Sequence, residues 1–227
     1  MKRLLVSVVL FAFAVPVSAD NYHEYRKGAL YEVTITNLTK ASQFTPILAA
    51  THRRSISYFE LGQPPSPGLA LMAEDGNVGL LADELSATGK VLDTANSADV
   101  LGTPPLLFAG QSVTLQLESD GRRNVRLSFA AMILPTNDSF VALNSVRLPR
   151  FGKTTYLALG YDAGSEPNDE WCANIPGPLC GGVGASEEAG GEGHVHVANG
   201  IHGIADVPAA TYDWRNPVAR VTVKRVR

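Results

Sequence analysis

The sequence predicts an all-β protein, a single antiparallel β-sandwich with long loops and little helix. Short segments in which apolar and polar residues alternate recur along the chain, and turn-forming glycine, proline, aspartate and asparagine residues separate them. Segments with helical periodicity are scarce, and the chain shows neither an internal repeat nor a composition shift that would mark a domain boundary. Several short strands joined by turns are typical of a sandwich.

Strands are expected where the alternation is strict. In residues 29–38, apolar side chains occupy every second position from Tyr31 to Ile35, as on a half-buried strand. Residues 113–117 and 124–129 alternate in the same way, and the Ser-Asp-Gly-Arg sequence between them predicts a turn that joins them in a hairpin. Further strands are expected at residues 140–148, 155–159 and 218–226, and short helical turns at residues 69–73 and 78–85.

Residues 1–19 have the three parts of a secretory signal peptide. Two basic residues come first, residues 4–15 form an uncharged apolar core, and small residues follow at the positions that a signal peptidase recognises. Cleavage is expected to leave one domain of residues 20–227, secreted or periplasmic. The apolar core is short for a bilayer and no later stretch is longer, so we expect no stable membrane span after cleavage. An uncleaved anchor is the alternative.

The charge of the chain gives little sign of a nucleic-acid partner. The formal net charge is −3, and the loss of the two positive charges of Lys2 and Arg3 takes it to −5. No run of lysine and arginine is visible before residues 221–227, which alternate like a strand with a basic outer face. We therefore expect no nucleic acid among the partners.

Cys172 and Cys180 are the two cysteines of the chain. In an oxidising compartment, two cysteines this close in sequence are expected to form a local disulfide. The closed loop is short, so the bridge would stabilise the fold by roughly 2–3 kcal/mol and mainly stiffen the loop. A redox-active pair is the alternative, which the spacing disfavours because it is not C-x-x-C.

Three blocks of sequence carry a family resemblance. The first, residues 31–76, contains Phe-Thr-Pro-Ile-Leu-Ala-Ala-Thr-His and then Ala-Glu-Asp-Gly; the second is Met-Ile-Leu-Pro-Thr-Asn-Asp-Ser-Phe-Val-Ala-Leu at residues 132–143; the third is Tyr-Asp-Ala-Gly-Ser-Glu at residues 161–166. In order and spacing, they resemble the spondin amino-terminal domain of F-spondin, mindin and many bacterial exported proteins. The family shows similar "Met-Ile-x-Pro-Ser-Pro-Asp" and "Asp-Ala-Gly-Thr-Asp" elements.

The resemblance implies a β-sandwich that binds calcium at one end of its sheets. Carried over by position, the ligands would be Asp138, Asp162 and Glu166. Calcium takes several hard oxygens at about 2.3–2.6 Å in flexible geometry, so it can absorb the glutamate that replaces the family's last aspartate. Thr-Asn in place of Ser-Pro relaxes the backbone before Asp138. The alternative is that these acids only cap turns.

Three histidines gather in residues 193–203. His194 and His196 would share one face of a strand, and His202 follows after the next turn. Imidazoles on one face can chelate zinc or copper. The alternative is that they are histidines hydrogen-bonded within a packed sheet.

The sequence contains no nucleophile elbow, phosphate loop or H-E-x-x-H motif, so nothing in it argues for an enzyme. The expected function is that of an exported, calcium-binding, non-catalytic module for adhesion or for binding an extracellular or cell-surface ligand. The alternative is a periplasmic transition-metal protein or metal-dependent hydrolase that uses the three histidines.

Overall fold

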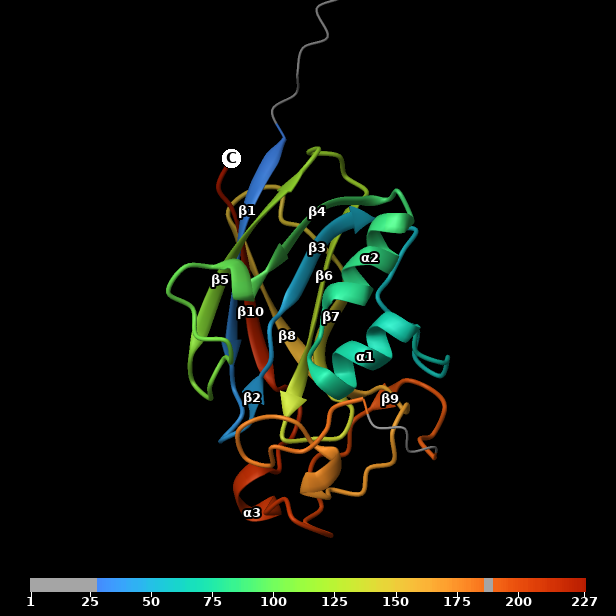
Figure 1. Cartoon of the computed structure of the whole chain (residues 1–227). Helices are drawn as coiled ribbons and strands as arrows, with labels where there is room; N and C mark the ends of the chain where they lie inside the picture. Colours follow the sequence, from blue (N-terminus) through green and yellow to red (C-terminus); the bar gives the residue numbers. More distant parts are fainter. Residues whose placement is uncertain (1–27, 186–189) are drawn as a thin grey trace, which may run out of the picture.

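The computed structural model describes residues 28–185 and 190–227 (Figure 1). The predicted signal peptide, residues 1–19, and the first residues of the predicted domain lie outside this part of the chain. Within the described residues, no helix has both the length and the apolar character needed to cross a bilayer.

Strands dominate the described residues, as the sequence predicts, and they pair in the order β4-β3-β6-β7-β8-β10-β1-β5, with β2 added to β6 and β9 to β8. All of the pairings are antiparallel. The strands are β1 (Ala29–Asn37), β2 (Gln43–Phe44), β3 (Leu48–Arg53), β4 (Val91–Asn96), β5 (Ser112–Ser119), β6 (Val125–Leu134), β7 (Ser139–Arg147), β8 (Lys153–Asp162), β9 (His196–Val197) and β10 (Ala219–Arg225).

Helices are few and short. The helices are α1 (Pro67–Asp75), α2 (Gly79–Ala87) and α3 (Ala209–Tyr212), with 3-10 turns η1 (Ser97–Asp99) and η2 (Cys172–Asn174). α1 begins where the Ser66 hydroxyl accepts a hydrogen bond from the Leu69 N–H, and it ends at Gly76, whose φ is 72°. Glycine suits that position because positive φ disfavours a side chain, and a Cβ there would lie 2.7 Å from Thr45.

The predicted hairpin between residues 113–117 and 124–129 is wrong. β5 pairs with β1, whereas β6 pairs with β3 and β7, so the turn carries the chain from one layer to the other. The burial patterns give the reason. β5 buries every second residue, as an edge strand with one solvent-exposed face does. β6 is buried along its whole length except at Arg126. A strand covered on both faces belongs in the middle of a sheet.

The protein has two apolar cores, one on each face of the strands β6 and β7. The larger core lies between the layers and includes Val33 of β1, Leu115 of β5 and Phe129 of β6. The smaller core lies on the other face of β6 and β7, where α1 and α2 cover it (Figure 1). The largest fully buried side chain of this second core is Phe140, the second residue of β7, two positions after Asp138.

Cys172 and Cys180 form the predicted disulfide, with their Cα atoms 4.5 Å apart. The bridge closes the loop that begins with η2 at the lower end of the molecule in Figure 1. It therefore stiffens a loop rather than joining the two layers, as its short span implies.

His52 of β3 is a fully buried histidine that holds three segments together. Its Nδ1 lies 2.9 Å from the Arg53 carbonyl oxygen and its Nε2 lies 2.8 Å from the Ser128 hydroxyl, which itself accepts a hydrogen bond from the Ser145 N–H. Because a carbonyl can only accept, Nδ1 carries the proton and Nε2 accepts from Ser128. The neutral imidazole therefore fits the site.

Stability should fall on acidification through His52. Burial lowers the pKa of His52; the bond to the Arg53 carbonyl opposes this effect and the charge of Arg126 adds to it. Above pH 6.5, the unfolded-state pKa, the imidazole is neutral in both the folded and the unfolded protein. Below pH 6.5, the unfolded chain takes up a proton while the folded protein does not. The free energy of unfolding therefore falls with decreasing pH until the pH reaches the lower pKa of the folded state. His52→Gln should lose less stability than the wild type between pH 7.5 and pH 5, measured by urea unfolding. Equal losses would contradict the assignment.

Candidate metal centre

The candidate site lies where β6, β7 and β8 meet at one end of the sandwich. The turn between β6 and β7 is fixed by Thr136, whose hydroxyl donates to the Ile133 carbonyl at 2.6 Å and accepts from the Ser139 N–H at 3.1 Å. Ser139 of β7 pairs with Asp162 of β8. The register therefore places Asp138, just before β7, beside Asp162, the last residue of β8.

Asp138 is fully buried. Its Oδ2 accepts hydrogen bonds from the backbone N–H groups of Ser165 (2.8 Å) and Glu166 (3.1 Å), while its Oδ1 is buried and has no hydrogen-bond partner among the described residues. Burial and the charge of Asp162 raise the pKa of Asp138 to about 7, although the two backbone bonds act in the opposite direction. A cation at this position would relieve the repulsion between the two carboxylates.

Asp162 is 2% exposed and is oriented by its own loop. Its Oδ1 accepts from the Gly164 N–H at 2.9 Å, and its Oδ2 accepts from the Asn168 side-chain amide at 3.0 Å. Both aspartates thus do cap their turns, which was the alternative interpretation of the sequence. Capping does not exhaust their capacity, because each carboxylate oxygen can accept more than one contact.

Two glycines allow the loops around the site to approach closely. Gly164 has a φ of 67°, and a Cβ there would lie 2.4 Å from the His194 carbonyl oxygen. A Cβ on Gly191 would in turn lie 2.4 Å from the Gly164 carbonyl oxygen. The segment after β8 and the segment before β9 therefore pack backbone against backbone, and this contact brings residues 192–196 to Asp162.

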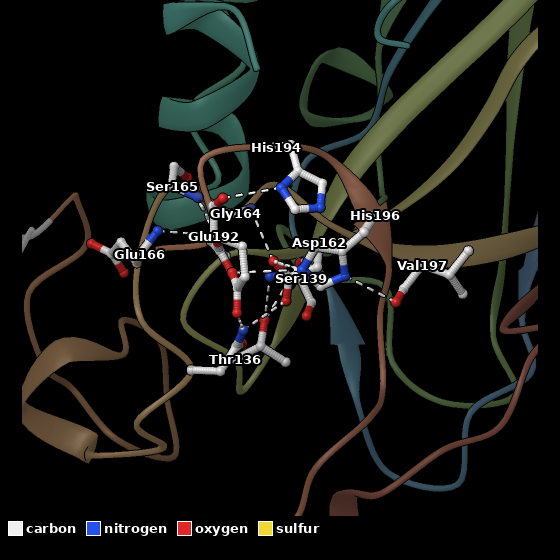
Figure 2. Close-up of polar contacts among 12 residues, drawn as sticks. Thr136, Ser139, Asp162, Gly164, Ser165, Glu166, Glu192, His194, His196 and Val197 are labelled. Atoms are coloured by element: carbon white, nitrogen blue, oxygen red, sulfur yellow. Dashed lines mark hydrogen bonds and ion pairs between the residues drawn. The ribbon is translucent and has the colours of Figure 1, made fainter. Parts of the chain in front are cut away.

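The third predicted calcium ligand, Glu166, does not join the aspartates through its side chain. Its backbone N–H binds Asp138, but its buried side chain points away from Asp162 in Figure 2. Glu192 and His196 lie there instead. One ligand atom from each of Asp162, Glu192 and His196 lies within 4.8 Å of the other two.

The three histidines do not gather as the sequence suggested. His196 lies with its Nε2 3.4 Å from Asp162 and 3.5 Å from Glu192. Burial would lower the pKa of His196, but its hydrogen bond to Val197 and the charges of Asp162 and Glu192 together raise it. His194 is exposed, with its ring centroid 5.5 Å from that of His196.

His202 is exposed and belongs to another loop, held by Glu170. The Glu170 carboxylate accepts hydrogen bonds from the N–H groups of His202 (2.5 Å), Gly203 (2.7 Å) and Ile204 (2.9 Å). The Glu170 N–H donates to the side chain of Asn137, the residue before Asp138. Glu170 therefore positions the loop beside the metal centre. Among the described residues, His194, His196 and His202 form no common metal-ligand group. The alternative, histidines hydrogen-bonded within a sheet, applies to His196, which lies on β9 with its Nδ1 3.1 Å from the Val197 carbonyl oxygen.

The sequence of the chain is similar to those of known proteins. The family model described as Spondin_N matches residues 35–168, more than half of the chain, from the last residues of β1 to Asn168. The chain belongs to this family. Membership indicates an extracellular, adhesion-type module, which agrees with secretion and gives the periplasmic alternative no support. Asp138, Asp162 and Glu166 lie inside the matched residues, whereas Glu192 and His196 lie outside them.

Two relatives of this spondin-type chain cover nearly its whole length. Spondin-2 of Homo sapiens is 26% identical over 246 aligned residues, which cover 98% of this chain and 69% of that protein. Spondin-2 of Rattus norvegicus is 27% identical over 238 residues, covering 93% of this chain and 66% of that protein. The similarity therefore extends beyond the family model, through the segment that carries Glu192 and His196.

Sequence reasoning missed Asn168, Glu170 and Glu192 in this spondin-type site. A weak signal was present for one of them, because Glu192 precedes His196 by four residues in a glycine-rich segment. Nothing in the sequence placed that segment against the end of β8, since the contact depends on the packing of Gly164 and Gly191.

Proposed function

We propose that the chain is an extracellular, non-catalytic spondin-type module that binds calcium and contacts an adhesion partner through its loops. One observation supports the calcium site above all: Asp138 is fully buried, its Oδ1 has no hydrogen-bond partner among the described residues, and a second buried carboxylate lies beside it. Burying two like charges together is costly unless a cation compensates them.

The donor set fits calcium. Asp138 and Asp162 would supply hard carboxylate oxygens, and Glu192 can add another from the segment before β9. The hydrogen bonds from Gly164, Ser165 and Glu166 hold the two aspartates in place before any ion arrives. When bound, calcium supplies positive charge that joins the loops at the ends of β6, β7 and β8. Extracellular calcium modules are tuned to 10⁻⁴–10⁻³ M, roughly the concentration outside cells.

A transition metal is the second candidate, and it rests on His196. Asp162, Glu192 and His196 together offer two carboxylates and one imidazole. Three protein ligands with an open position are typical of catalytic zinc, so this set would suit the metal-protein or hydrolase alternative. Its ligands overlap with the calcium set at Asp162 and Glu192, so the two functions would compete for one centre.

Elemental analysis of protein purified without a histidine tag separates the two candidates. The calcium module predicts about one calcium per chain above the buffer background after dialysis against about 5 mM calcium, and no stoichiometric zinc or copper. His196→Ala should then leave the calcium content unchanged, as should the matched variant His202→Ala at an exposed position. Stoichiometric zinc that His196→Ala removes and His202→Ala keeps would support the transition-metal protein instead.

A further inference from the structure

A second polar surface lies at the end of the sandwich opposite the metal centre. β7 begins at Ser139 beside Asp162 and ends at Arg147, which places the two ends about 26 Å apart at roughly 3.3 Å per residue. A cleft of about 620 Å³ opens at the Arg147 end, near the C-terminus at the top of Figure 1. Seven arginines line it: Arg54, Arg122, Arg123, Arg126, Arg147, Arg150 and Arg225.

The arginines reach the cleft from separate parts of the chain. Arg54 follows β3, Arg122 and Arg123 lie in the connection between β5 and β6, and Arg150 lies between β7 and β8. Arg126, Arg147 and Arg225 lie on strands β6, β7 and β10. In the sequence, no more than two of these arginines are adjacent, so the basic surface exists only in the folded protein.

Carboxylates neutralise little of the charge of this cleft. No aspartate or glutamate of the described residues lines it. Asp120 forms an ion pair with one lining arginine, Arg122, at 3.3 Å, and another with Arg53 at 2.6 Å. In the described part of the chain, no carboxylate lies within 4.0 Å of the side-chain nitrogens of Arg123 or Arg147.

Backbone groups fix some of the guanidinium groups without removing their charge. Arg225 donates to the carbonyl oxygen of Arg150 at 2.7 Å, and Arg126 donates to that of Val125 at 3.1 Å. The seven arginines are more than a third of the 19 basic residues of a chain whose net charge is −3. Positive charge gathered in a hollow focuses the electrostatic field and attracts anions.

We propose that this cleft binds an acidic polysaccharide that carries sulfate or carboxylate groups. Guanidinium groups pair with both kinds of anion through two parallel hydrogen bonds, and several of them facing one cleft suit a ligand with repeated charges. Phe151 borders the cleft and is 86% exposed, so it offers an apolar face on which a sugar ring can lie. The choice of an extracellular glycan rests on the proposed function, which places the module outside the cell.

The shape of the cleft favours a polysaccharide over the other polyanions. A bilayer surface is flat and contacts the protruding side chains of a protein. These arginines line a hollow instead, which a single extended polysaccharide chain can enter. Single-stranded nucleic acid is held largely by bases stacked on several aromatic side chains. Among the residues that line the cleft, Phe151 is exposed but Tyr31 is buried, which leaves one such platform.

The test is the binding of a fluorescent heparin oligosaccharide of defined length, measured by anisotropy at about 50 and 200 mM salt. The wild type should bind, and binding should weaken steeply with salt because counterions are released. Arg123→Gln with Arg147→Gln should weaken binding at least about tenfold and lower the salt slope by roughly one to two. The matched pair Lys40→Gln with Arg220→Gln removes the same charge away from the cleft and should change the affinity by less than about twofold.

Several results would overturn the proposal: no heparin binding at about 50 mM salt, equal weakening by the two double variants, or tighter binding to phosphatidylserine vesicles or single-stranded DNA than to heparin. Unchanged melting temperatures confirm that the variants fold. If the double variant Arg123→Gln with Arg147→Gln has a lower melting temperature than the wild type, the single variant Arg150→Gln replaces it and should weaken heparin binding about threefold or more. Each measurement is repeated in EGTA. Heparin binding that persists in EGTA would show that the cleft works without calcium. A failure of the calcium site would then leave the heparin result unaffected, and the two proposals can fail separately.

Discussion

Phe140→Ala should lower the free energy of unfolding by about 3–5 kcal/mol. The ring is fully buried in the core beneath α1 and α2, where it packs edge-on against Phe59 with the ring centroids 5.3 Å apart. Removing it leaves a cavity that the surrounding strand and helices cannot close, so both transfer energy and packing are lost. Urea unfolding should show a lower midpoint with an unchanged slope.

Phe151→Ala is the matched control for this substitution. It removes the same atoms from a side chain that is 86% exposed, so it should change stability by no more than about 0.5 kcal/mol. If the two variants were equally stable, the second core would not contribute as the packing indicates.

Removal of calcium with EGTA should lower the melting temperature by about 5–10 °C. An ion that binds only the folded state stabilises it by about 2.7 kcal/mol when its free concentration is 100 times its Kd, which means about 10 mM calcium for a Kd of about 0.1 mM. For a chain this size, 1 kcal/mol shifts the melting temperature by about 2–4 °C. Asp162→Asn should abolish the shift, because it removes one of the two buried charges that calcium would compensate.

Asp83→Asn is the control for the calcium experiment. Asp83 is an exposed carboxylate on α2, far along the chain from the aspartates of the site, and its variant should keep the full EGTA shift. A shift that survives in Asp162→Asn would mean that the stabilising ion binds elsewhere. Differential scanning fluorimetry with calcium restored after EGTA gives the comparison within one sample.

Much of the fold could be predicted because local patterns report local burial. The alternation from Tyr31 to Ile35 matches the strictly alternating burial of β1, and the helical turns near residues 69–73 and 78–85 are α1 and α2. The hairpin failed because alternation shows which face of a strand is buried but not which strand lies beside it. β5 and β6 are adjacent in sequence, yet they belong to different layers.

The metal centre could be predicted only in part, for a related reason. Asp138 and Asp162 follow from the family resemblance and from the ends of two paired strands. Glu192 and His196 reach Asp162 through a contact between Gly164 and Gly191, which joins segments more than 25 residues apart. The arginine cleft could not be predicted from the sequence for the same reason. Its residues converge only where the end of β3, the start of β6 and the ends of β7 and β10 come together in the fold.

The central claim is that Asp138 and Asp162 form a calcium site, and calcium titration into EGTA-treated protein tests it most directly. Isothermal calorimetry should show one calcium bound per chain with a dissociation constant at or below about 1 mM. Asp138→Asn, which keeps an oxygen to accept from Ser165 and Glu166, should fold but bind no calcium. A folded wild-type protein that binds no calcium at about 5 mM, or an Asp138→Asn variant that binds it as the wild type does, would contradict the claim.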